Sequence, residues 1–261
     1  MNDILLSLIL GIIQGLTEFL PISSSAHLLL PALIFELRDF GLAFDIAVHA
    51  GTLLAVIYYF KREISMMALS TYSNDRTLDE YRKLFAMLIV ASIPIVFAGL
   101  GLSDYISERI FNLSSIAIAN LIFAAILLFA FLRRKENITI LEVTTKAALI
   151  IGIFQCMALV PGASRSGTAI TGALLVGLTM KDASKFAFLL SIPAIFGAII
   201  FLIADFNNQD FLSISSLIGF LVSFIFAFFT IKYFLAFVEK IGMIPFVIYR
   251  VILGLILLLL I

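Results

Sequence analysis

Six long apolar segments set the strongest constraint on how this chain can fold. They fall near residues 44–60, 84–102, 114–132, 186–204, 211–231 and 243–261. Each is close to the roughly 20 residues that a helix needs to cross a bilayer. Of the 261 residues, 62% are hydrophobic and 13% are charged, whereas about a quarter of a soluble domain is charged. In lipid only helices or closed barrels satisfy the backbone, and the alternating pattern of barrel strands is absent, so we expect a helical membrane protein.

Four shorter apolar segments accompany the long ones, near 4–20, 24–36, 146–160 and 167–179. Each is too short or too interrupted to cross a bilayer alone, so we interpret them as two re-entrant helical hairpins. Irregular backbone at that depth is tolerated only where it is buried in protein or lines a cavity. The expected fold is therefore all-α, with six transmembrane helices plus two hairpins in one membrane domain over 1–261.

The two hairpins share a pattern of glycine, two apolar residues, glutamine, and then proline and a serine cluster. Gly11 precedes Gly152 by 141 residues, and Gln14 precedes Gln155 by the same interval. Each unit contains a hairpin and three spans, an odd number, so the two units must insert with opposite orientations. We therefore predict an inverted repeat with halves of about 1–135 and 140–261. Such repeats bring interrupted helices together near the membrane centre.

The distribution of lysine and arginine predicts an orientation. Thirteen of the 17 basic residues fall on one side of the six spans, within the loop 61–83, the connection 133–146 and the positions Lys181, Lys185, Lys232 and Lys240. Only Arg38 and Arg109 fall on the other side. Because cytoplasmic loops carry the basic excess, we expect the first hairpin's base and both termini outside. The net charge of zero gives no indication of a nucleic-acid partner.

The first hairpin carries an acidic side chain inside an apolar segment. Gln14 and Glu18 are four residues apart, so they share one face of a helix. A carboxylate within a membrane is costly and indicates a functional site by default. The alternative is that Glu18 merely pairs with a buried arginine for packing.

A serine cluster and a histidine follow directly, as Ser23, Ser24, Ser25 and His27. At least one of these serines is expected to cap the next helix, which would begin near Ala26. His27 lies three residues after Ser24, within reach as an activating base or as a nucleophile itself.

The interruption of the second hairpin carries a more specific sequence motif, Pro161-Gly162-Ala163-Ser164-Arg165-Ser166-Gly167. The glycines permit close backbone approach, and the serines and backbone N–H groups suit an anion. Arg165 offers a planar fork that matches phosphate, at the start of a predicted half-helix. The alternative is a capped break in which Arg165 neutralises Glu18. We expect His49 to be structural, and Arg250 to snorkel or pair for packing.

At these residues the chain resembles the undecaprenyl-diphosphate phosphatase family of the bacitracin-resistance type. The likeness is carried by Gln14 to Glu18, Pro21 to His27 and Pro161 to Gly167, with further similarity over 44–55, 188–193 and 248–250. It therefore covers nearly the whole chain. Two positions depart from the family pattern: Gln14 replaces a commoner glutamate, and Ser25-Ala26 stands where Thr-Gly is usual.

The resemblance implies hydrolysis of undecaprenyl diphosphate to the monophosphate and phosphate, which recycles the lipid carrier of cell-wall synthesis. It also implies a bacterial inner-membrane protein whose site opens outward, dependence on a divalent cation such as Mg²⁺ or Ca²⁺, and resistance to bacitracin. The alternative is a transporter or flippase for a polyprenyl phosphate lipid, since inverted repeats with broken helices are typical of transporters. The oligomeric state and the preferred lipid length stay open.

The resemblance also suggests a role for each site residue. The nucleophile is Ser24 or His27, and we favour Ser24 with His27 as base or acid. Glu18 would bind the cation or handle protons, and Arg165 would hold the diphosphate. The further substrate-binding candidates are Gln14, Ser25, Gly162, Ser164 and Ser166.

Overall fold

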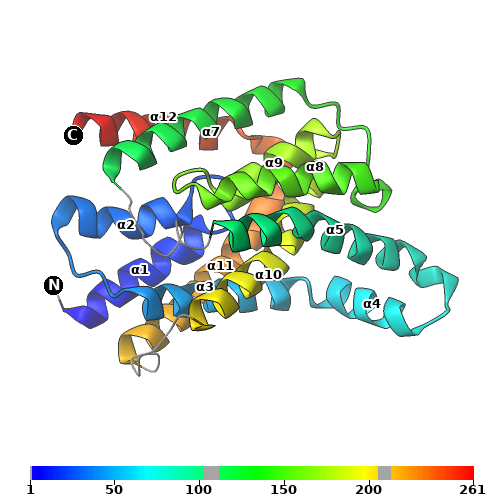
Figure 1. Ribbon diagram of the computed structural model, residues 1–261, viewed down its shortest axis with the longest axis horizontal. Coiled ribbons are helices and arrows are strands. Elements are labelled where there is room, and N and C mark those ends of the chain that lie inside the picture. Colours follow the sequence, from blue (N-terminus) through cyan, green and yellow to red (C-terminus); the bar gives the residue numbers. More distant parts are fainter. Residues whose placement is uncertain (1, 103–111, 205–212) are drawn as a thin grey trace.

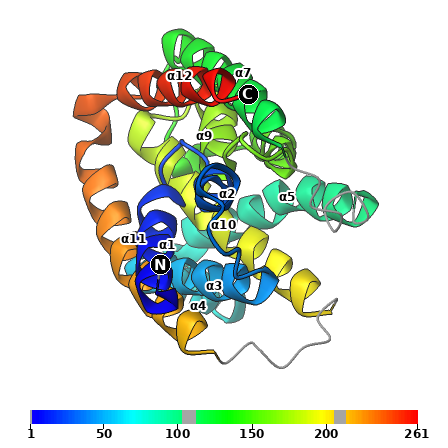
Figure 2. The same ribbon diagram turned by 90° about the vertical axis from the view of Figure 1, so that its left-hand side faces the viewer.

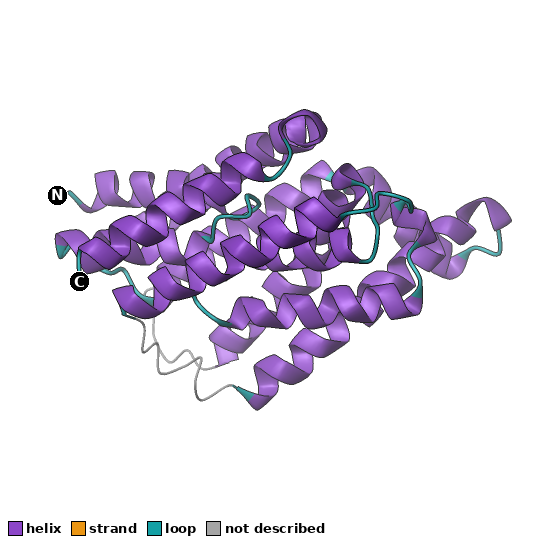
Figure 3. Ribbon diagram, turned by 90° about the horizontal axis from the view of Figure 1, so that it is seen from above, coloured by secondary structure: helices purple, strands orange, loops and turns teal. Residues whose placement is uncertain are grey.

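A computed structural model describes residues 2–102, 112–204 and 213–261, and the regular structure in these ranges is helical apart from one isolated bridge. Most of the helices in Figure 1 run along its long horizontal axis, whereas α11 (Ile214–Ile241) crosses them; Figure 3 shows the same helices from above. The longer helices are α3 (Leu42–Tyr59), α4 (Lys61–Tyr72), α5 (Asp79–Gly101), α7 (Leu113–Arg133), α10 (Met180–Ala204), α11 (Ile214–Ile241) and α12 (Ile244–Leu259).

The two segments predicted as hairpins each form a pair of short helices. The first pair is α1 (Asp3–Thr17) and α2 (Ser24–Phe35), and the second is α8 (Thr145–Cys156) and α9 (Arg165–Leu175). The members of each pair pack against each other. A short 3₁₀ turn, η3 (Met157–Leu159), extends α8 toward its break. The prediction of two helical pairs at these places is confirmed.

Five helices in the described ranges are long and apolar enough to cross a membrane, and they match the first five predicted spans. They cover Leu42–Tyr59, Arg76–Gly101, Leu113–Arg133, Met180–Ile200 and Ile214–Ile241. The sixth predicted span, 243–261, is the shorter helix α12. The chain is thus an all-α, multi-pass membrane protein. Arg109, expected outside, lies beyond the described residues.

The segment 61–83, predicted as a loop, is instead largely helical. After Phe60 the chain enters α4, and after a short 3₁₀ turn at Arg76–Leu78 it enters α5. Residues 61–72 contain neither glycine nor proline, so the helical geometry continues past the end of the apolar run. In Figure 1 this part lies at the end opposite to both termini.

Helix α9 lies at the centre of the bundle. Figure 2, viewed from the end that carries the termini, shows α9 and α10 inside, with α11, α12 and α5 around them. The side chains from Ser166 to Leu174 are all buried, and they pack against α8, α10 and α7. The half-helix that begins at Arg165 is therefore held rigidly from several sides.

Small residues allow the closest helix contacts, as is usual where lipid supplies no hydrophobic driving force between helices. Helices α3 and α11 cross where Gly51 meets Ser223 and the backbone of Phe220. The hydroxyl of Ser223 donates a hydrogen bond to the carbonyl of Val48, at 2.9 Å. A Cβ atom on Gly51 would lie 2.3 Å from the carbonyl oxygen of Phe220, which leaves no room for a side chain.

We predict that Gly51→Ala destabilises the protein by about 1–3 kcal/mol, because the new methyl group must push two backbones apart. The matched control is Gly101→Ala, where a Cβ would meet no atom within 4 Å. The control should be neutral or stabilised by up to about 1 kcal/mol through helix propensity. Thermal unfolding of both variants in detergent measures the difference, and equal midpoints would contradict the close α3–α11 contact.

Candidate functional site

The first break is the segment 18–23 between α1 and α2, and the second is the segment 160–164 between η3 and α9. Both breaks contact the buried side chain of Arg250 on α12. Its Nη2 donates to the carbonyl of Gly162 at 2.7 Å, and its Nη1 donates to the carbonyls of Ala163 at 3.1 Å and Pro21 at 3.4 Å. Its Nε donates to Oδ1 of Asn120 at 2.8 Å. Arg250 is 0% exposed, so of the two expected possibilities snorkelling is wrong and pairing within the bundle is confirmed. It satisfies carbonyls that the interrupted helices leave without partners.

Both breaks turn through a serine with a left-handed backbone. Ser23 has φ 72° and Ser164 has φ 74°, and they are 141 residues apart, the interval seen between the glutamines. A non-glycine residue with positive φ costs about 1–3 kcal/mol and is often found at functional sites. Ser164 caps α9 by accepting from the N–H of Gly167 at 3.1 Å. Ser23 occupies the same position before α2 but makes no side-chain cap, so the capping expected in the first cluster is not found.

Ser166 and Gly162, two predicted substrate-binding residues, make packing contacts and do not line the cavity described below. The hydroxyl of Ser166 donates to the carbonyl of Leu20 at 2.8 Å, which ties the second break to the first. Gly162 has φ 94°, and a Cβ there would lie 2.7 Å from the carbonyl oxygen of Ile116. Only glycine fits this position, so the sequence signal at Gly162 reflects close packing.

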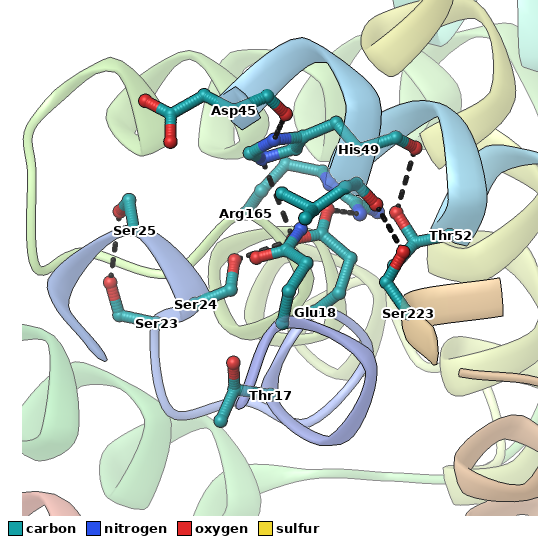
Figure 4. Close-up of polar contacts among 12 residues, drawn as sticks. Thr17, Glu18, Ser23, Ser24, Ser25, Asp45, His49, Thr52, Arg165 and Ser223 are labelled. Carbon is teal, nitrogen blue, oxygen red and sulfur yellow. Dashed lines mark hydrogen bonds and ion pairs between the residues drawn. The ribbon is translucent and has the colours of Figure 1, made fainter. Parts of the chain in front are cut away.

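Glu18 is the hub of the polar contacts, as Figure 4 shows. Its Oε1 accepts from Nη2 of Arg165 at 2.6 Å. Its Oε2 accepts from Oγ of Ser24 at 2.5 Å and from Nε2 of Gln14 at 2.9 Å. Glu18 is 6% exposed, and the pairing with Arg165 offsets the cost of burying its charge. The contact given above as the alternative interpretation, in which Arg165 neutralises Glu18, is thus present, and it is compatible with a functional role of either residue.

A cavity of about 390 Å³ opens beside this hub. Its polar end is lined by Glu18, Ser24, Ser25, Ser164 and Arg165, so five of the predicted residues share one space. Ser23 and His49 also face it. The other predicted residues, Gln14, His27, Gly162 and Ser166, do not line the cavity.

His27 is not paired with Ser24 in this structure. Its Nδ1 lies 2.6 Å from the carbonyl oxygen of Ser23, and its Nε2 lies 2.6 Å from the hydroxyl of Tyr249, on which the ring also stacks. Both ring nitrogens therefore have other partners, and Ser24 bonds to Glu18. Residues three apart in a helix can lie side by side, and both belong to the first turn of α2, but each side chain is bonded elsewhere: Ser24 to Glu18, and His27 to the carbonyl of Ser23 and to Tyr249.

His49 was interpreted as structural, but the structure places it in the site. It projects from α3, lines the cavity, and has Nε2 3.8 Å from Oε2 of Glu18. It lies 31 residues beyond Glu18, in a separate helix. The signal that could have found it is its position within 44–55, one of the segments that carry the family resemblance, together with its apolar setting.

Arg165 keeps one amino group free for a ligand. Its Nη2 binds Glu18, whereas its Nη1 is buried and has no hydrogen-bond partner among the described residues. Buried donors are almost always satisfied, so this guanidinium nitrogen is a candidate to bind an anion. A planar fork can bind two oxygens of a phosphate at once.

The implied divalent cation would find few protein ligands here. No group of three or more His, Cys, Asp or Glu side chains gathers anywhere in the described part of the chain. The available donors are Glu18 and the nitrogen of His49, together with Oε1 of Gln14, which is buried and unpaired. Mg²⁺ is commonly held by one or two carboxylates plus substrate phosphates, and such a sparse set fits that pattern.

Comparison with known proteins identifies the family. The family model for bacitracin resistance protein BacA matches residues 7–256. The chain belongs to this family. A relative from Saccharophagus degradans, named undecaprenyl-diphosphatase, is 44% identical over 256 residues, which cover 97% of this chain and 96% of the relative. Another of the same name, from Alcanivorax borkumensis, is 42% identical over 252 residues and 95% of each chain. The family resemblance inferred from the motifs is confirmed.

We predict that Arg250→Lys lowers stability by about 2–4 kcal/mol, because lysine cannot reach the same carbonyls and each unpaired buried carbonyl costs about 1–3 kcal/mol. The control is Arg38→Lys, whose side chain is 66% exposed, forms an ion pair with Asp3 and lies over the ring of Phe40. Thermal unfolding in detergent should separate the two variants clearly. A normal midpoint for Arg250→Lys would mean that the breaks hold their shape without this side chain.

Proposed function

We propose that this chain hydrolyses undecaprenyl diphosphate to undecaprenyl phosphate and phosphate. The observation that carries the proposal is the placement of Ser24 and Arg165 at the polar end of one cavity, on either side of Glu18. A hydroxyl and an arginine fork side by side suit attack on a bound phosphoryl group. The relatives named undecaprenyl-diphosphatase point to the same reaction.

The diphosphate would be held at the start of α9. Arg165 is the first residue of that helix, and Ser164 at its cap lines the cavity. Helix N-termini attract phosphate through free backbone N–H groups and the helix dipole. The unpaired Nη1 of Arg165 would bind one phosphate oxygen while Nη2 keeps Glu18 in place.

The rest of the cavity suits a hydrocarbon tail. It continues between α5 and α10, lined by apolar residues that include Ile95, Val96, Pro193 and Ala194. Val96 and Leu100 line the cavity and are also exposed on the outer surface of the bundle. A lipid tail could thus leave the polar end sideways, toward the membrane. This layout supports a polyprenyl substrate over a soluble diphosphate.

The geometry supports Ser24 as the nucleophile. Its hydroxyl donates to Oε2 of Glu18, so its proton has an acceptor as the oxygen attacks the terminal phosphorus. Attack breaks the bond between that phosphorus and the bridging oxygen, which leaves as part of the lipid monophosphate. Water then cleaves the phosphoserine and releases phosphate, and the proton returns to Ser24. Arg165 would stabilise the charge on the phosphoryl oxygens.

A divalent cation, when bound, would neutralise charge on the diphosphate. We propose that Glu18 is its charged protein ligand, and that most of its affinity comes from the substrate. The Glu18–Arg165 pair has no net charge, so the protein alone would attract a cation only weakly.

We further propose six spans with two re-entrant hairpins, in an inverted repeat, in the bacterial inner membrane. The matching serines with positive φ, 141 residues apart, support the repeat. The basic segments 61–83 and 133–146 lie at one end of Figure 1 and the termini at the other, which supports a cytoplasmic basic end. The cavity is lined by the later parts of α5 and α10, which run away from the basic end, so it would open to the outer face.

We predict that Ser24→Ala lowers phosphate release from undecaprenyl diphosphate by at least about 100-fold, because it removes the attacking oxygen. The control is Ser65→Ala, which removes a hydroxyl that only donates to the carbonyl of Lys61 on α4. Purified protein in detergent, assayed for phosphate, gives the result.

Near-normal phosphate release by Ser24→Ala would exclude Ser24 as the nucleophile and leave His27 as the candidate. If wild-type protein releases no phosphate yet moves labelled lipid diphosphate between the leaflets of vesicles, the flippase alternative replaces the enzyme.

We also predict that a cysteine at position 38 reacts with a membrane-impermeant maleimide on intact spheroplasts, whereas one at position 76 reacts only after permeabilisation. Cys156, the single native cysteine, is replaced by alanine in both variants. The physical reason is the basic excess on the side that carries Arg76. The opposite labelling pattern would reverse the orientation and place the cavity on the cytoplasmic side.

A further inference from the structure

The imidazole of His49 has a fixed tautomer. Its Nδ1 lies 2.7 Å from the carbonyl oxygen of Asp45, one turn earlier in α3. A carbonyl oxygen only accepts, so Nδ1 carries the proton and donates it. In the neutral ring Nε2 then holds a lone pair, and its side chain is 30% exposed where it lines the cavity.

That lone pair faces a second electron-pair donor. Nε2 of His49 lies 3.8 Å from Oε2 of Glu18, and Figure 4 shows the ring directed at the carboxylate. The separation is too long for a direct hydrogen bond. Two protein ligands of one ion, each at about 2.1 Å, lie roughly 3.0–3.5 Å apart. The observed pair is a few tenths of an ångström wider, a gap that a small side-chain rotation closes.

The remaining atoms of the hub are consistent with a cation at this place. Arg165 binds Oε1 of Glu18. Oε2 accepts hydrogen bonds from Ser24 and Gln14 and lies on the side of His49. Gln14 is fully buried, and its Oε1 has no partner within the described ranges. Glu18 is the one carboxylate among the described residues that line the cavity. A cation here therefore needs a further ligand, and His49 supplies the one imidazole among the described residues that line the cavity.

We propose that His49 Nε2, together with Glu18, is a protein ligand of the divalent cation. The proposal rests on the cation dependence included in the proposed function and deepens it. The coordinate bond joins a neutral imidazole to the metal, so it adds no further charge beside Arg165. An imidazole ligand shifts preference from Mg²⁺ and Ca²⁺ toward Mn²⁺, Co²⁺ and Zn²⁺.

The test is pulsed electron paramagnetic resonance on Mn²⁺ bound to purified protein with a methylene diphosphonate lipid analogue. The chain contains two histidines, so a nitrogen coupling can be assigned by mutation, provided that the affinity tag carries no histidine. Wild type and His27→Gln should both show the coupling of a ligated imidazole nitrogen. His49→Gln should lose it, and calorimetry should show Mn²⁺ affinity reduced by about tenfold or more.

The double variant Gln14→Glu/His49→Gln supplies a further check. It replaces the imidazole by a second carboxylate four residues from Glu18, on the same helix face. Cation affinity should recover, with preference moved toward Mg²⁺ and Ca²⁺.

Three results would overturn the proposal: bound Mn²⁺ with no nitrogen coupling in wild type, a coupling that persists in His49→Gln, or no Mn²⁺ binding at all. None depends on turnover. Phosphate release by wild type and its loss in Ser24→Ala are measured separately, so failure of the ligand assignment is distinguished from failure of the proposed reaction.

Discussion

The requirement that every backbone polar group be satisfied inside a membrane governs this structure. Two interruptions between helices leave backbone carbonyls inside the bundle, where each needs a partner from the protein. Arg250 supplies donors to three of these carbonyls, two in the second break and one in the first, and Asn120 fixes its orientation. Ser166 adds a bond from the second break to the first. The chain can therefore keep irregular backbone in its interior, and this backbone carries the reactive side chains.

The same arrangement determines the electrostatics of the site. Because the breaks are joined, Glu18 from the first lies against Arg165 from the second, and each charge offsets the burial cost of the other. The pair is neutral as a unit, yet Arg165 retains an unpaired amino group. In the function proposed above, the unpaired part of the guanidinium would bind an anion, while the carboxylate contacts Ser24 and lies near His49. Recognition and chemistry thus share one ion pair.

Function also depends on the change from polar to apolar lining within one cavity. The polar end is supplied by the breaks and by α3, and the apolar part by α5 and α10. A soluble diphosphate would gain nothing from the apolar part, whereas a lipid diphosphate fills both. The conformational cost at Ser23 and Ser164, which adopt positive φ, is offset by the tight packing around α9.

The sequence by itself determined the membrane class, the approximate positions of five long spans, the two helical pairs, and the motifs that place Glu18, Ser24 and Arg165 in one site. These follow from local apolar runs and from residues close together in the chain, which constrain structure directly. The tertiary structure alone decided that His27 turns to Tyr249, that His49 faces Glu18, and that Gly162 and Ser166 fasten the breaks. These outcomes depend on helix rotation and on contacts between distant segments, and neither the spacing of residues nor their composition records the direction in which a helix presents a side chain.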